Sequence, residues 1–350
     1  MILFLRIRRK DRVFSRRREE TVQCRNSILW PLNHFPLVSL PPMEGRIIDR
    51  YEGVDPGPLL ICIGSMHGNE PAGLLAIQEV FRLLDIETVL NPGFRYHGSF
   101  VGIRGNLQAI EKSQRFIDRD LNRMLLKEEM DRITSSPEES WTSEDMECID
   151  LIRTIEEEKR KHKPSASLIL DLHTTTADGG IFTIAADDQM SRTLAKGLHA
   201  PVIQGFAENL KGTTLSYFNR STEDAFCIVF EGGQHDDPES VYRTAAAIVN
   251  CMRAIGSVDS CDVDHRHDGM LIRMSEGLPK VTKLIYHYRI TDGEQFVMNP
   301  GYKNFQPLKA GEIVAHNEQG PIASPVDGLI LMPKYQILGE DGFFVVEVVE

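Results

Sequence analysis

The stretch that decides the fold is Pro58-Leu-Leu-Ile-Cys-Ile-Gly64, a short apolar run that ends in glycine. Such a run predicts a strand that is buried on both faces, as in a parallel sheet. A polar loop follows at 65–70, and Pro71 lies where a helix would begin. Apolar residues then recur at helical spacing over 74–84. The pattern therefore predicts a strand followed by a helix that packs its apolar face on the sheet.

The same alternation continues along the chain. Strands are predicted at 98–103, 167–173, 181–185 and 225–231, and helices at 144–161 and 238–255. Alternating strands and helices predict an α/β sheet covered on both faces, in which ligands gather outside the carboxyl ends of the strands. His67, His173 and Glu231 fall at such ends. We therefore expect these three side chains to meet at one edge of the sheet.

The C-terminal part has a different pattern. A polar stretch at 257–268 predicts a linker, and the short runs after it, punctuated by glycine and proline, predict a small all-β domain from about 267 to 350. The expected organisation is a catalytic domain at 43–258, followed by the linker and β domain at 259–350.

The first 42 residues carry nine arginines and lysines. This composition predicts a disordered extension, with Met43 as the natural start of the protein. The alternatives are an arginine-rich arm that binds anionic surfaces and a transit peptide.

Composition narrows the functional classes. The net charge of −12 argues against broad binding of nucleic acid. Six cysteines without a CxxC pair predict free thiols in a reducing compartment, and hence a cytoplasmic protein. Apolar runs all fall short of the roughly 18 residues that span a bilayer. A homo-oligomer remains possible.

One loop and one strand end suggest a metal site. His67 and Glu70 lie three residues apart in Gly64-Ser-Met-His-Gly-Asn-Glu70. Alone this pair is a weak signal, because a solvated loop histidine is the ordinary alternative. His173 completes a set of two histidines and one carboxylate, which leaves a position for water, as catalytic zinc sites do. The sequence therefore predicts one zinc ion per chain, with Asp171 placed to orient a ligand histidine.

Two further features suggest chemistry beside the metal. The segment Arg115-Phe-Ile-Asp-Arg-Asp-Leu-Asn-Arg123 contains arginines that could grip carboxylates bidentately, although a salt-bridged surface turn is the alternative. Glu231 ends an apolar strand, where it could act as a general base, or else pair with an arginine at the sheet edge.

These motifs together resemble the succinylglutamate desuccinylase and aspartoacylase family, within the zinc carboxypeptidase-like folds. The resemblance runs from about Met43 to the C-terminus. It rests on the motif at 64–70, the segment 115–123, Asp171-Leu-His-Thr and the late strand-end Glu231. The resemblance implies a mixed sheet flanked by helices, followed by a small β domain that caps the active site.

The resemblance also implies roles for individual residues. His67, Glu70 and His173 match the zinc ligands, Glu231 the general base, and Arg123 a position near the scissile carbonyl. The implied substrate contacts are Arg115, Asn122, Arg123, Tyr217, Arg220 and Tyr335, and the implied carboxylates behind the ligands are Asp171 and Asp120.

The activity implied by the resemblance is zinc-dependent hydrolysis of a small acidic N-acyl amino acid, such as an N-succinylglutamate or N-acylaspartate, to a carboxylic acid and an amino acid. The sequence departs from the aspartoacylase pattern at two places, and both argue against specificity for acetylaspartate. Glu231 is followed by Gly-Gly-Gln-His instead of Gly-Pro-Gln, and His173 is followed by Thr-Thr-Thr instead of Asn-Thr-Thr. The alternatives are a metallocarboxypeptidase that acts on peptide C-termini and a non-catalytic homologue that binds a metal or small molecule.

Overall fold

The computed structural model describes residues 45–221, 225–259 and 266–350, without the side chains of 220 and 221. The expected N-terminal extension at 1–42 and the start at Met43 lie outside the described residues.

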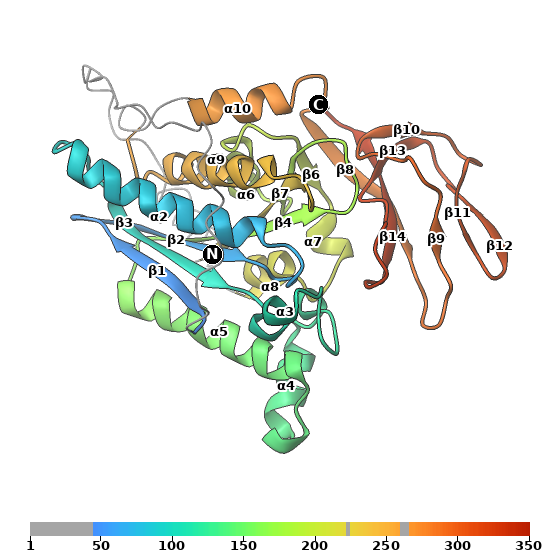
Figure 1. Cartoon of the computed structure of the whole chain (residues 1–350), viewed down its shortest axis with the longest axis horizontal. Coiled ribbons are helices and arrows are strands. Elements are labelled where there is room, and N and C mark those ends of the chain that lie inside the picture. The colour runs from blue at the N-terminus through green and yellow to red at the C-terminus, as the bar shows by residue number, and fades with distance from the viewer. Residues whose placement is uncertain (1–44, 222–224, 260–265) are drawn as a thin grey trace, which may run out of the picture.

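An eleven-stranded mixed sheet runs through the described part of the chain (Figure 1). Its strands, in spatial order, are β1 (Ile47–Glu52), β3 (His97–Arg104), β2 (Asp55–Gly64), β4 (Ser167–Thr175), β7 (Ala225–Gln234), β5 (Phe182–Ala185), β6 (Val202–Gln204), β8 (Val281–Arg289), β14 (Asp341–Val348), β13 (Gly328–Leu331) and β10 (Gln306–Leu308). Strands β3, β2, β4 and β7 are parallel, whereas β5 is antiparallel to β7. This arrangement confirms the predicted α/β fold class.

Helices cover both faces of the sheet (Figure 1). On one face, α2 and α9 pack against a core that includes Leu60, Leu170 and Ile228; on the other, α5 and α8 pack against a core that includes Ile61 and Ile169. Odd and even residues of each strand therefore supply different cores. The helices, including the 3₁₀ turns η1 and η2, are α2 (Ala72–Leu90), α3 (Leu107–Lys112), η1 (Leu121–Arg123), α4 (Lys127–Ser135), η2 (Glu138–Ser140), α5 (Ser143–His162), α6 (Gln189–Lys196), α7 (Phe206–Asn209), α8 (Thr214–Ser221), α9 (Glu239–Ala254) and α10 (Arg266–Met274).

The C-terminal strands join the same sheet rather than standing apart from it. β8 pairs with β6 in parallel, and β14, β13 and β10 extend the sheet in antiparallel fashion. A separate three-stranded sheet holds β9 (Val297–Met298), β11 (Ile313–Asn317) and β12 (Gly320–Ala323). The C-terminal region therefore reaches back to the strands that carry the site.

Helix α10 corrects the expectation of only linker and strands after 257. It packs against α9 and buries His267 and Leu271, which lie four residues apart. The helix is a little over two turns long, so its buried face holds too few apolar residues to show a helical period in the sequence.

In the described ranges, none of the helices has the length and apolar character needed to cross a membrane. The cysteines at 62, 148, 227 and 251 are buried free thiols. Cys24 and Cys261 lie outside the described residues.

Candidate metal and substrate site

A tight loop at the carboxyl end of β2 delivers His67 and Glu70. Ser65 adopts the left-handed conformation with φ of 57°, and its hydroxyl donates a 2.7 Å hydrogen bond to the main-chain oxygen of Glu70. Gly68 lies so close to Ala109 that a Cβ there would stand 2.0 Å from a main-chain carbon. The loop can therefore approach α3 only because that residue is glycine.

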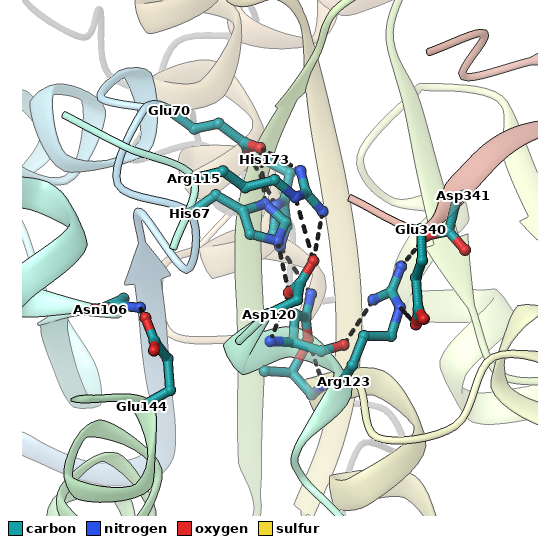
Figure 2. Close-up of polar contacts among 12 residues, drawn as sticks. His67, Glu70, Asn106, Arg115, Asp120, Arg123, Glu144, His173, Glu340 and Asp341 are labelled. Atoms are coloured by element: carbon teal, nitrogen blue, oxygen red, sulfur yellow. Dashed lines mark hydrogen bonds and ion pairs between the residues drawn. The ribbon is translucent and has the colours of Figure 1, made fainter. Parts of the chain in front are cut away.

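His67, Glu70 and His173 form a buried cluster that could hold a metal ion (Figure 2). His67 Nδ1 lies 2.8 Å from Glu70 Oε1, and His173 Nδ1 lies 3.0 Å from Glu70 Oε2. One ligand atom from each residue lies within 4.8 Å of the others. Two imidazole nitrogens and one carboxylate are a donor set that zinc accepts in catalytic sites, where a fourth position stays open. The residues present therefore fit the predicted metal.

Each histidine turns its other ring nitrogen toward a carboxylate. His67 Nε2 lies 3.2 Å from Asp120 Oδ1, and His173 Nε2 lies 3.0 Å from Asp171 Oδ2. Such partners fix the ring orientation and raise the basicity of a ligating histidine. The two aspartates thus lie behind the proposed ligands.

The cluster is strongly coupled electrostatically. Burial acts to raise the pKa of Glu70, but His67 and His173 hold it well below its usual range. Burial acts to lower the pKa of His173, but the neighbouring carboxylates of Asp171 and Glu70 raise it well above its usual value. The carboxylates therefore create a negative pocket that stabilises a cation at this place.

Glu231 lies beside the ligands, because β7 pairs with β4 and the register sets Glu231 opposite His173. Its Oε2 atom is buried and has no hydrogen-bond partner among the described residues. Burial raises the pKa of Glu231 to about 8. His173 acts to lower this pKa, and Glu70 adds a smaller upward effect. A buried carboxylate with a spare oxygen and a pKa near neutrality is suited to proton transfer.

The segment 115–123 forms a second wall of the site and is fixed by a residue far along the chain. Glu144, at the start of α5, accepts hydrogen bonds from the main-chain amides of Ile117, Asp118 and Arg119, and from the side chain of Asn106 (Figure 2). This buried carboxylate was not predicted from the sequence.

The two arginines of this wall have carboxylate partners of their own. Arg115 Nη2 donates to Asp120 Oδ2 over 2.9 Å. Arg123 Nη2 donates to Asp341, at the start of β14, and Arg123 Nε lies 3.5 Å from Glu340 Oε1 (Figure 2). The C-terminal strands therefore reach the proposed catalytic residues directly.

One pocket gathers most of the predicted site. His67, Glu70, His173, Glu231, Arg115, Asn122 and Arg123 all line it. Lining residues that were not predicted are Thr174, Thr175, Thr176, Ile184, Phe206, Leu210, Thr213, Leu215, Val229, Met332, Lys334, Gln336, Leu338, Gly339, Asp341 and Phe344. His235 also lines the pocket, with Nδ1 2.7 Å from Thr174 Oγ1.

Two predicted substrate contacts are corrected by their positions. Tyr217 packs against Phe218 in the core beside α5 instead of lining the pocket. Leu215 does line the pocket, and a residue two positions further along a helix points to a different face of α8. Tyr335 does not line the pocket; its hydroxyl donates to the main-chain oxygens of Asn299 and Tyr302. The side chain of Arg220 lies outside the described residues.

Comparisons with known proteins agree with this fold. Residues 56–255 match the model of the succinylglutamate desuccinylase/aspartoacylase catalytic domain. A probable aspartoacylase of Nostoc sp. is 29% identical over 122 residues, which are 35% of this chain and 37% of that protein; the chain thus matches little more than a third of that relative's length.

Solved structures show the same fold at low sequence identity. Succinylglutamate desuccinylase from Vibrio parahaemolyticus superposes with a TM-score of 0.57 at 17% identity, over 85% of this chain and 83% of that one. Murine aminoacylase 3 superposes with a TM-score of 0.53 at 15% identity, over 84% and 96% of the two chains. With more than half of its length matched by the family model, the chain belongs to the succinylglutamate desuccinylase/aspartoacylase family.

Proposed function

We propose that this protein is a zinc-dependent amidohydrolase that cleaves the amide bond of an N-acyl amino acid. The observation that carries the proposal is the position of Glu231: a buried carboxylate with a spare oxygen lies beside His67, Glu70 and His173 in one pocket. A protein that only binds metal has no use for such a base, which argues against the non-catalytic alternative.

Zinc in such a three-ligand site supplies a Lewis acid and lowers the pKa of a water molecule to about 7. Glu231 accepts a proton from the attacking water and delivers it to the leaving nitrogen, so one group serves first as base and then as acid. The products are a carboxylic acid and a free amino acid.

Arg123 stabilises the negative charge that develops on the carbonyl oxygen. Its Nη1 and Nη2 atoms are held by Asn122 O and Asp341, and its buried Nε lies 3.5 Å from Glu340 Oε1 without a hydrogen bond in the described residues. A donor fixed in advance costs little reorganisation when charge develops, which makes such contacts large contributors in acyl transfer. Arg115 and Asn122 hold the substrate against the metal site.

The substrate is a small molecule rather than a peptide C-terminus. The pocket is bounded on one side by residues between 332 and 344, which come from the C-terminal region. Such a cap limits the length of what can enter. Every N-acyl amino acid carries at least one carboxylate, so the substrate is acidic in this general sense.

The proposal is tested by removing and restoring the metal. Purified protein should contain about one zinc per chain, as a three-ligand site requires. Treatment with a chelator should abolish hydrolysis of N-acyl amino acids, and zinc should restore it. Full turnover by metal-free protein contradicts the proposal, as does a zinc-loaded protein that hydrolyses none of them.

A further inference from the structure

Asp341 faces the pocket because β14 carries a β-bulge at its start. The register of β14 with β8 skips Gly342, which lies unpaired between Asp341 and Phe343. An extra residue of this kind turns the side chains that precede it to the other face of the strand. Without the bulge, Asp341 would share a face with Phe343, which belongs to a core cluster separate from the pocket wall.

The bulge places Asp341 on the same face of the two strands as His287 and Phe344. Phe344 lies opposite His287 in the register, and the two rings stack with their centroids 4.4 Å apart. His287 Nε2 lies 2.8 Å from Asp341 Oδ1, and only 18% of the His287 side chain is exposed. The stacking therefore fixes the imidazole ring, and the ring in turn fixes the carboxylate.

Asp341 passes this constraint to Arg123 (Figure 2). Its second oxygen, Oδ2, accepts a hydrogen bond from Arg123 Nη2. Burial acts to raise the pKa of Asp341, but Arg123 and His287 hold it well below its usual range, so the carboxylate is ionised and His287 Nε2 donates to it. Arg123 Nη1 donates over 2.6 Å to the main-chain oxygen of its neighbour Asn122. These two contacts use two of the five N–H groups of the guanidinium, which leaves donors for a substrate.

Glu340 offers Arg123 a second contact, which is weaker. Glu340 Oε1 lies 3.5 Å from Arg123 Nε, and Glu340 Oε2 accepts a 2.7 Å hydrogen bond from Arg289 Nη2. The Arg289 side chain is 67% exposed, so solvent screens this pair. The more buried pair of His287 and Asp341 is therefore the stronger constraint on Arg123.

We propose, resting on the function proposed above, that His287 is a positioning residue for the hydrolysis. It holds Asp341, and through Asp341 it holds the guanidinium of Arg123 in the orientation that receives the negative charge of the carbonyl oxygen. His287 itself does not line the pocket, so it acts through other side chains. A donor that is fixed in advance stabilises developing charge without reorganisation, and small misplacements of such a group lower the rate.

Two substitutions of His287 separate the hydrogen bond from the ring packing. His287→Phe keeps a ring against Phe344 and removes the donor, whereas His287→Gln keeps an N–H near the position of Nε2 and removes the ring. His287→Phe should lower kcat/KM about tenfold, and His287→Gln should stay within about threefold of the parent. Equal losses, or a larger loss in His287→Gln, would mean that packing accounts for the effect and would overturn the inference.

Tyr288→Phe is the matched control on the next residue of β8. Tyr288 stacks on Phe343, on the face of the strand opposite His287, and its hydroxyl donates over 2.6 Å to Glu294. The variant loses one hydrogen bond to a carboxylate in the same part of the chain without touching Asp341 or Arg123, so kcat/KM should remain parental. A loss as large as that of His287→Phe indicates a general disturbance of the C-terminal strands and overturns the inference.

A double-mutant cycle tests whether His287 acts through Asp341. Asp341→Ala removes the link to Arg123, so adding His287→Phe in that background should change kcat/KM by less than about twofold. The same loss from His287→Phe in both backgrounds contradicts action through Asp341.

All variants are measured as zinc-loaded full-length protein, with zinc content determined for each preparation. The substrates are N-acetylaspartate, N-succinylglutamate and N-acetylleucine, and kcat/KM is compared on the one that the parent hydrolyses best. An unchanged kcat/KM in His287→Phe overturns the inference and leaves the amidohydrolase proposal standing. If the zinc-loaded parent hydrolyses none of the three, the amidohydrolase proposal is overturned and the inference with it.

Discussion

At the scale of single residues, the site is organised by which nitrogen each histidine turns inward. Both His67 and His173 present Nδ1 to Glu70 and Nε2 to an aspartate. The residue types and their strand-end positions could be predicted from the sequence. The ring orientations could not, because they depend on Asp120 and Asp171 being brought to the correct distance by the fold.

Removing one ligand tests the metal assignment. His173→Ala deletes one of three proposed donors and should reduce the zinc content to well below one per chain, measured by elemental analysis of the purified protein. His235→Ala is the control, since His235 lines the same pocket without belonging to the cluster. Stoichiometric zinc in His173→Ala would falsify the ligand assignment.

At the scale of elements, the strands were easier to predict than their partners. The apolar runs at 58–64, 167–173 and 225–231 became β2, β4 and β7, because a strand buried on both faces needs an unbroken apolar run. The antiparallel direction of β5 carries no such local signal. The contact between Glu144 and the segment 115–123 is made by a side chain with main-chain amides. Main-chain amides are present at nearly every residue, so a pattern of residue types does not reveal such a contact.

This anchoring yields a prediction for the segment 115–123. Glu144→Gln replaces an acceptor-only group with one that carries an amide donor, so some of the main-chain amides at 117–119 lose their partner. We expect stability to fall by about 1–3 kcal/mol in chemical denaturation and kcat/KM to fall at least about tenfold, with zinc content unchanged. The exposed Glu139→Gln is the control. An unperturbed kcat/KM in Glu144→Gln means that this contact does not position the segment.

At the scale of the whole molecule, the C-terminal strands complete the pocket of the first half of the chain. Arg123 and Asp341 are 218 residues apart in sequence yet form an ion pair, and His287 lies 2.8 Å from the other carboxylate oxygen of Asp341. The family resemblance implied a small β domain that caps the site and a substrate contact from Tyr335. The structure brings Lys334, Gln336 and Asp341 to the pocket instead.

The ion pair predicts a pH-dependent contribution to stability. Burial acts to raise the pKa of Asp341, but Arg123 and His287 hold it well below its usual range. A lowered pKa means that the contribution is present above the unfolded pKa of about 4 and is lost as the pH falls below it. Asp341→Asn should therefore cost on the order of 2 kcal/mol near pH 7, and the difference from the parent should shrink below pH 4. Denaturant titrations at pH 7 and pH 3 measure it; a difference that does not depend on pH contradicts this origin.

The most direct test of the account is Glu231→Gln, measured for zinc content and turnover in the same preparation. Glutamine keeps the shape of the side chain and removes the proton acceptor, and Glu231 is not one of the three proposed ligands. General acid–base groups contribute roughly a hundredfold to ten-thousandfold. We predict that the variant keeps about one zinc per chain and the parental fold but loses at least about a hundredfold in turnover. Turnover within a few fold of the parent at full zinc occupancy contradicts the assignment, and His235 then becomes the base to test.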